Sequence, residues 1–177
     1  MKMFKTFTIL TLGIFSVLSI STVMNLHKAN AQPVEDNDNE QKVCRKSVTG
    51  TYLITLKNAN GDFASRSLIT LTADGNFVFS DSNQGGISGR FNPFTTGQGT
   101  WKCTGKKEVS ARALDFSLSD QGGTGIARND YLATFDPQTN TVTGTINLQF
   151  FDLQGNPLEG DVQSGSTSFT GQRVTPN

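Results

Sequence analysis

The chain has 177 residues, of which 17% are charged and 35% are hydrophobic, and it carries 15 basic and 15 acidic residues. This length favours one domain with an appendage, and it is enough for a single hydrophobic core. Lys2, Lys5 and Lys28 lie in a segment that we expect to be removed, which leaves 12 basic residues against 15 acidic ones. This slightly acidic mature chain has no electrostatic footprint for nucleic acid or for an anionic membrane, so neither is an expected partner.

Residues 1–31 have the three-part layout of a secretory signal peptide. Two lysines precede an almost wholly apolar run over 7–24, and residues 29–31 read Ala-Asn-Ala, the small-residue pattern of a cleavage site. A membrane anchor is the alternative, because the run is nearly long enough to span a bilayer. The hydroxyl side chains within the run and the cleavage site after it favour the signal. We therefore expect a secreted or periplasmic protein that begins at Gln32 and has no membrane insertion after cleavage.

Residues 32–47 are expected to form a flexible acidic leader. The first ten of them include four acids and a single large apolar residue, too little apolar surface to offset the entropy lost on ordering. Asp36, Asp38 and Glu40 alternate as ligands of a calcium loop do. The central glycine and the final glutamate of an EF-type loop are missing, however, so a solvated linker is the better interpretation.

From residue 48 onward, short extended runs alternate with turn residues. The clearest run is 141–151, in which Val142, Ile146 and Leu148 alternate with polar residues, as a half-buried strand requires. A Gly-rich segment over 81–97 is longer than most connections, and loops of that length tend to be functional or mobile. No helix of three turns is expected. The predicted strands are 51–57, 67–72, 77–79, the two arms of a hairpin over 99–118, 126–135, 141–151 and 164–174.

These runs predict an all-β fold over residues 48–177. About eight consecutive strands with short links most simply form an antiparallel up-and-down meander, closed into a barrel, with a β-sandwich as the alternative. Closure is favoured because an open meander leaves two unprotected edges. A barrel of eight strands is either filled by its own side chains or holds one small ligand.

The two cysteines and the histidine restrict the chemistry. Cys44 and Cys103 are the only cysteines, and in an oxidising compartment they are more often paired than free, so we predict a disulfide. The only histidine, His27, lies in the predicted signal, so the mature chain has no imidazole. Hydrolysis by a Ser-His-Asp triad is thereby excluded, and no metal site or cofactor is expected.

Carboxylate chemistry is the option that remains for an enzyme, and the sequence favours a protein without catalysis. Four acids lie in or near predicted strands, and a glycosidase needs two such groups facing each other across a cleft. We interpret them instead as surface or turn carboxylates that pair with Arg112 or Arg128. The four are Glu108, Asp115, Asp130 and Asp152.

Aromatic residues provide the candidate ligand site. Seven of them fall on the apolar faces of their strands and would converge inside a barrel. They either fill the core or line a cavity for a small apolar molecule, and the sequence leaves both open. The seven are Tyr52, Phe77, Phe79, Trp101, Tyr131, Phe135 and Phe150.

A short motif resembles a known superfamily of barrels. Gly99-Thr100-Trp101 is similar to the Gly-x-Trp signature of the calycins, the lipocalin and avidin superfamily, and Arg173 resembles the cation that packs over that tryptophan in lipocalins. The resemblance implies an up-and-down barrel whose mouth binds small hydrophobic molecules. In lipocalins the motif lies on the first strand, whereas three predicted strands precede it here. The ending 169–173 is also similar to that of secreted barrels of the allene oxide cyclase and dirigent type.

Three functional hypotheses follow. The leading one is an exported binding module that holds a small hydrophobic molecule or presents its loops to a cell-surface partner. The second is a cyclase or isomerase whose cavity folds a bound substrate beside a carboxylate. The third is a structural or adhesive envelope protein with a solid barrel, in which the loop 81–97 makes the contacts.

Overall fold

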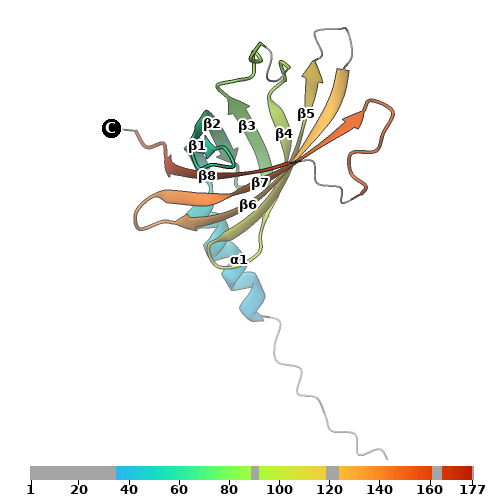
Figure 1. Cartoon of the computed structure of the whole chain (residues 1–177). Helices are drawn as coiled ribbons and strands as arrows, with labels where there is room; N and C mark the ends of the chain where they lie inside the picture. Colours follow the sequence, from blue (N-terminus) through green and yellow to red (C-terminus); the bar gives the residue numbers. More distant parts are fainter. Residues whose placement is uncertain (1–34, 89–91, 119–123, 161–164, 177) are drawn as a thin grey trace, which may run out of the picture. The chain divides into compact units, whose positions relative to one another are not determined.

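The computed structural model describes residues 35–88, 92–118, 124–160 and 165–176, with the side chains of 35–37 left out, so the predicted signal over 1–31 lies outside the described residues. It contains one helix and eight strands (Figure 1). They are α1 (Glu35–Val48), β1 (Gly50–Lys57), β2 (Phe63–Leu71), β3 (Asn76–Asp81), β4 (Gly97–Cys103), β5 (Glu108–Leu118), β6 (Thr124–Asp136), β7 (Thr141–Asp152) and β8 (Gly165–Arg173).

The strands form a closed antiparallel barrel. Each strand pairs with the next along the chain, and β8 returns to pair with β1, where Tyr52 lies opposite Arg173. The prediction of an all-β, eight-stranded meander barrel is confirmed, and the β-sandwich alternative is wrong. Full closure leaves no free sheet edge, which is the physical advantage that favoured the barrel.

The helix α1 corrects the expectation that the chain has no helix of three turns, and within the leader expected over 32–47 it shows residues 35–47 as helical; residues 32–34 lie outside the described residues. α1 spans 14 residues, and Cys44 and Val48 near its C-terminus are fully buried against the barrel. The first described side chains of α1 are exposed. Because a helix this short is marginal by itself, its packing and its covalent link to the barrel account for a helix that the composition does not indicate.

The two ends of the barrel differ. At the end next to α1, the connections between strands are four-residue turns, namely 72–75, 104–107 and 137–140. At the opposite end the connections are longer and include 82–96 and 153–164. In Figure 1 the long connections lie at the end away from α1. We call the two ends the helix end and the loop end.

Side chains fill the helix end of the barrel. The ring centroids of Tyr52 and Phe135 lie 5.0 Å apart, and the Tyr52 hydroxyl donates to the carbonyl of Val48 at 3.0 Å. The Trp101 indole N–H donates to the carbonyl of Thr72 at 3.0 Å. This end of the barrel is therefore a packed hydrophobic core.

Two arginines cover the aromatic residues of this core. The guanidinium of Arg45, from α1, lies 5.4 Å from the centre of the Trp101 ring, and that of Arg173 lies 5.7 Å from the centre of Tyr52. Arg173 also donates to the carbonyls of Ser47 and Thr49, beside the end of α1. The expectation from the lipocalin resemblance, that Arg173 packs over the tryptophan, is wrong, because Arg45 occupies that place.

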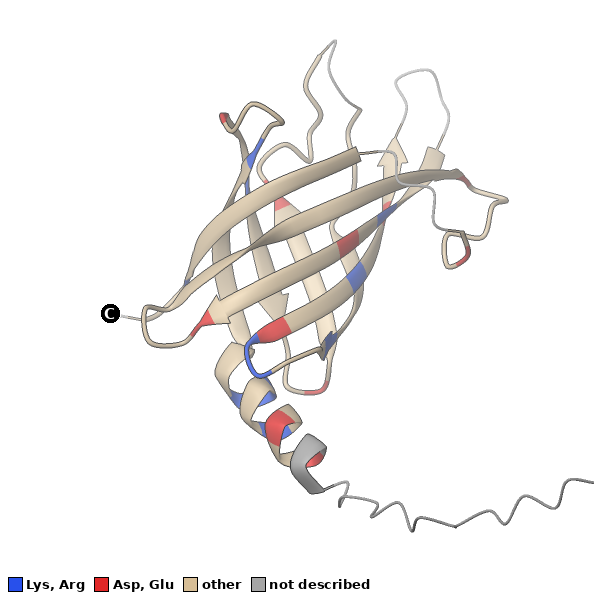
Figure 2. Ribbon diagram, turned by 60° about the horizontal axis from the view of Figure 1, so that its bottom comes forward, with Lys and Arg blue, Asp and Glu red and all other residues tan. Residues whose placement is uncertain are grey.

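The outer wall carries few charges, and Figure 2 shows long stretches of strand without any. Asp130 accepts from Arg112, with Nε and Oδ1 2.5 Å apart, and pairs with Arg128, with Nε and Oδ2 3.0 Å apart. Arg128 also donates to the carbonyls of Pro157 and Gly160, which holds the β7–β8 connection against the wall. Asp130 is thus a surface carboxylate paired with both predicted arginines.

No helix in the described part of the chain is both long enough and apolar enough to cross a membrane.

Candidate functional site

The loop end of the barrel is hollow. It contains a cavity of about 540 Å³, within the size range of small-molecule sites. Seven of the eight strands contribute to its wall, and the β3–β4 connection adds Asn83, Asn92 and Phe94. Phe94 is held in place by a bridge to Ser117 of β5. The long loop at 81–97 therefore contributes to the cavity wall.

Period-two alternation places successive layers of inward residues on β5, β6 and β7. Tyr131 lies opposite Ile146, Asn129 lies opposite Leu148, and Ala127 lies opposite Phe150. Ala127 also lies opposite Asp115 on β5. Asp115 is thus in the same layer as Phe150 near the mouth of the cavity, one layer above Asn129.

Aromatic rings form the boundary between the packed core and the cavity. Tyr131 lines the cavity, and its ring centroid lies 4.7 Å from that of Phe77 and 6.2 Å from that of Phe169, both buried below it. A side chain at Gly97 of β4 would overlap the Phe79 ring, because a Cβ there would lie 1.9 Å from Phe79 Cε1. The absence of a side chain at Gly97 therefore leaves room for the Phe79 ring, which lines the cavity.

The seven aromatic residues proposed as ligand contacts divide into two groups. Phe79, Tyr131 and Phe150 line the cavity. Tyr52, Phe77, Trp101 and Phe135 do not line it and belong to the buried core. All seven are on strands whose inward faces point into one barrel, but they lie at different heights along its axis.

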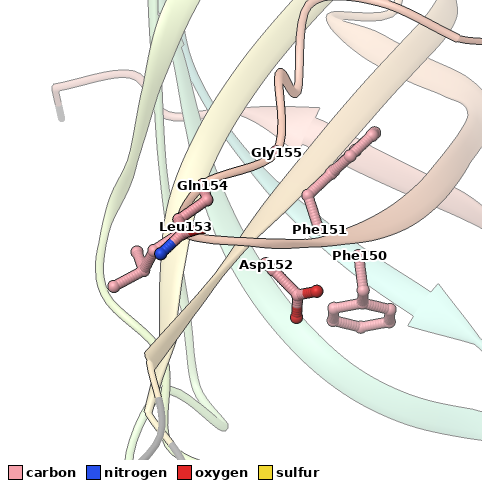
Figure 3. A pocket seen from close by; sticks show the side chains of 6 residues that line it. All are labelled: Phe150, Phe151, Asp152, Leu153, Gln154 and Gly155. Carbon is pink, nitrogen blue, oxygen red and sulfur yellow. The ribbon is translucent and has the colours of Figure 1, made fainter.

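Phe150 stands at the mouth, where 59% of its surface is exposed. Two recesses on the outside of the molecule adjoin the mouth and share Phe150, Phe151 and Asp152 with each other. Figure 3 shows that the side chains of Phe150 and Asp152 project from the same side of β7, whereas Phe151 projects from the other. The rim therefore presents one aromatic ring and one carboxylate beside the opening.

Two carboxyl groups of the described residues line the cavity. Asp115, only 5% exposed, accepts at Oδ2 from the amide of Asn129 at 2.7 Å, and its Oδ1 has no hydrogen-bond partner. Asp81 accepts from the hydroxyl of Ser65 at 3.0 Å and from the backbone N–H of Asn83 at 2.8 Å. Both oxygens of Asp81 therefore accept a hydrogen bond, whereas Oδ1 of Asp115 accepts none from the described residues.

Burial dominates the electrostatics of these groups. It raises the pKa of Asp115 to about 6, although the hydrogen bond from Asn129 acts in the opposite direction. Burial also raises the pKa of Asp81, opposed by the N–H of Asn83 and the hydroxyl of Ser65. For Tyr131, burial and then the charges of Asp81 and Asp115 raise the pKa, so its hydroxyl stays protonated at neutral pH.

The interpretation of the four strand carboxylates needs one correction. Glu108 and Asp152 are exposed, and Asp130 is paired with arginines, as expected of surface groups. Asp115 is instead buried in the cavity wall. The sequence contained the signal for this, because Asp115 continues the inward alternation of Ala111 and Ala113.

Sequence reasoning missed Asp81 and Asn129 as cavity residues. Both lie two positions from an aromatic residue that was assigned inward, Asp81 after Phe79 and Asn129 before Tyr131. The same alternation would have placed them correctly. Their polar character made a turn or surface interpretation the more common expectation.

The predicted disulfide between Cys44 and Cys103 is confirmed, and it links α1 to β4. Disulfides persist in oxidising compartments, which favours an extracytoplasmic location. In the part of the chain that the structure describes, no group of three or more His, Cys, Asp or Glu side chains is arranged to hold a metal ion.

Comparison with protein-family models, with curated proteins and with solved structures finds no match for this chain.

Proposed function

We propose that this protein is an exported carrier that binds one small, mainly apolar molecule in the cavity at the loop end of its barrel. The observation that supports this is the division of the barrel interior into a packed helix end and a hollow loop end. A barrel that served only as a rigid scaffold would gain stability from filling both halves, because empty apolar volume costs packing energy.

The lining supports a ligand that is apolar over most of its surface. Leu56, Phe79, Phe94, Ile146 and Leu148 provide apolar walls, and a few polar groups provide orientation. This combination is typical of small-molecule sites. The up-and-down barrel, which the calycin resemblance implied, agrees with the same role, and a barrel with a cavity supports the carrier better than the adhesive hypothesis, which assumed a solid barrel.

A plugged variant tests the carrier function. N-phenyl-1-naphthylamine, an apolar dye that fluoresces when it leaves water, should bind the protein from Gln32 to Asn177 with one site per chain. Ala127 faces the cavity between Asp115 and Phe150, so Ala127→Trp should fill the mouth and weaken dye binding at least tenfold. Titrations followed by fluorescence measure both affinities.

Leu132→Trp is the matched control. Leu132 is on the same strand but 55% exposed, and its side chain faces away from the cavity. This variant should bind the dye as the unmodified protein does. Equal loss in both variants, or undiminished binding to Ala127→Trp, would contradict a ligand site inside the barrel.

A cyclase or isomerase is the second candidate, because Asp115 combines a cavity position with a pKa of about 6. A carboxyl group with such a pKa can exchange a proton with a bound substrate near neutral pH. A molecule that co-purifies with the protein from its host distinguishes the candidates. If its mass and NMR spectrum are unchanged after incubation with fresh protein, the carrier is supported, whereas an isomer of the same mass supports catalysis.

A further inference from the structure

The charges that the described residues present to the cavity are all of one sign. Among the described residues that line it, Asp81 and Asp115 are the ionisable groups besides Tyr131, and no lysine, arginine or histidine is present. Arg112 is on the same strand as Asp115, but it lies three positions away and pairs with Asp130 on the outer wall. From the described lining residues an anionic ligand would meet two carboxylates and no compensating cation, so this part of the lining disfavours fatty acids and other organic acids.

One oxygen of Asp115 narrows the choice of ligand further. Its Oδ1 is buried and has no hydrogen-bond partner, while Asn129 holds the other oxygen. An ionised carboxylate accepts hydrogen bonds only, so the group that completes it must be a donor. A buried acceptor without a partner is costly, and a cationic N–H donor relieves that cost better than a neutral one.

The residues around Asp115 determine where such a donor can approach it. Asn129 fixes the carboxyl group from β6, and Ala127 beside it leaves free volume above the strand. The apolar residues Phe79, Ile146 and Leu148 line the same cavity. A ligand with its charged group at Asp115 therefore has apolar walls available for the rest of its length.

Resting on the carrier function proposed above, we propose that the cavity binds an amphiphilic amine, with an apolar body in the barrel and an ammonium group hydrogen-bonded to Oδ1 of Asp115. Asp81 contributes a second negative charge to the same cavity. Phe150 at the mouth covers the bound molecule on the solvent side, and Asp152 at the rim adds a negative charge where a cation enters.

Matched competitors test this proposal. Octylamine, octanol and octanoate have similar chains but carry a positive, a neutral and a negative group at pH 7.5. Each is titrated against the complex with N-phenyl-1-naphthylamine, which is uncharged at this pH. Octylamine should displace the dye at a concentration about tenfold lower than octanol does, because one charge-assisted hydrogen bond distinguishes them. Octanoate should be the weakest competitor.

The variant Asp115→Asn tests whether the carboxylate of Asp115 causes the advantage of octylamine over octanol. The amide is nearly isosteric and keeps an oxygen for Asn129, so the fold should be intact, which circular dichroism checks, and the dye affinity of the variant is measured again before the competitors are compared. The advantage of octylamine over octanol should fall to less than about threefold. Asp62→Asn removes an equal charge from the exposed β1–β2 turn and should leave the advantage unchanged.

The outcomes separate the two proposals. If the dye does not bind, the carrier function is wrong and the inference fails with it. If the dye binds but octylamine and octanol compete equally, or octanoate competes best, the carrier function stands and the amine preference is wrong. If the preference for octylamine persists in Asp115→Asn, a different group holds the charge and the assignment to Asp115 is overturned.

Discussion

Reduction of the disulfide between Cys44 and Cys103 is expected to lower the free energy of unfolding by about 4 kcal/mol. The bridge closes a loop between residues 59 positions apart, and the chain-entropy model gives this value for a loop of that length. Urea denaturation of the protein from Gln32 to Asn177, with and without tris(2-carboxyethyl)phosphine, measures the difference. The reduced protein should unfold at a clearly lower urea concentration.

The loss should begin at α1. Beyond the buried Cys44 and Val48, most of the described α1 side chains are exposed, so the helix depends on its attachment to β4. Hydrogen exchange should therefore show loss of protection in α1 on reduction, while the barrel strands remain protected. The double variant Cys44→Ala, Cys103→Ala is the control, because it should match the reduced protein and show no response to reductant. An unchanged unfolding midpoint after verified reduction would disprove the stabilising role.

The barrel could be predicted from the sequence because its signal is local. Alternation along runs such as 141–151 fixes which side chains share a face, and turn residues fix where strands end. The helix α1 could not be predicted, because 32–41 is acidic and nearly devoid of large apolar residues. Its structure depends on long-range contacts of Cys44 and Arg45, since the disulfide joins Cys44 to Cys103, 59 positions away, and Arg45 packs over Trp101.

The sequence also could not predict which inward residues lie in the core and which line the cavity. Alternation assigns Tyr52 and Phe79 equally to the inside, but their heights along the barrel axis depend on strand register, which joins distant segments. Register places Tyr52 opposite Arg173 at the helix end and Phe79 opposite Gly97 at the loop end. Of these two positions, only that of Phe79 adjoins the cavity. An inward carboxylate such as Asp115 can contact a ligand only at this end of the barrel.

Removal of the Asp115 charge is expected to stabilise the protein at alkaline pH. In the unfolded chain this carboxyl group titrates at its ordinary pKa of 3.8, and in the folded protein burial raises the pKa to about 6. Between these values the folded state binds more protons than the unfolded state, so the free energy of unfolding falls as the pH rises through this window. Above pH 6 the cost of the buried charge is present in full.

Asp115→Asn lacks this cost. At pH 8 its free energy of unfolding should exceed that of the unmodified protein by about 2 kcal/mol, since one pKa unit corresponds to about 1.4 kcal/mol and solvent screening near the cavity mouth reduces the full value. The difference should shrink as the pH falls and disappear near pH 4. Urea denaturation at pH 4, 6 and 8 measures it.

In the described part of the chain, the other titratable groups that face this cavity are Asp81 and Tyr131, with Asp152 at the rim, and all three are present in both proteins. The difference between the two curves therefore isolates Asp115. Asp62→Asn, which removes an exposed charge, should change the free energy of unfolding little at any of these pH values. A variant Asp115→Asn that is less stable at pH 8 would show that the protein itself stabilises the charge.

The same substitution should therefore raise stability and abolish the preference for an amine. If Asp115 had only a structural role, selection would favour the more stable asparagine at this position. A carboxylate that binds a cationic ligand would be retained despite its cost in stability. Octylamine should also stabilise the unmodified protein at pH 8 more than it stabilises Asp115→Asn, because a ligand that binds only the folded state adds its binding energy to folding. Equal stabilisation of both proteins would show that the buried charge of Asp115 does not contribute to octylamine binding.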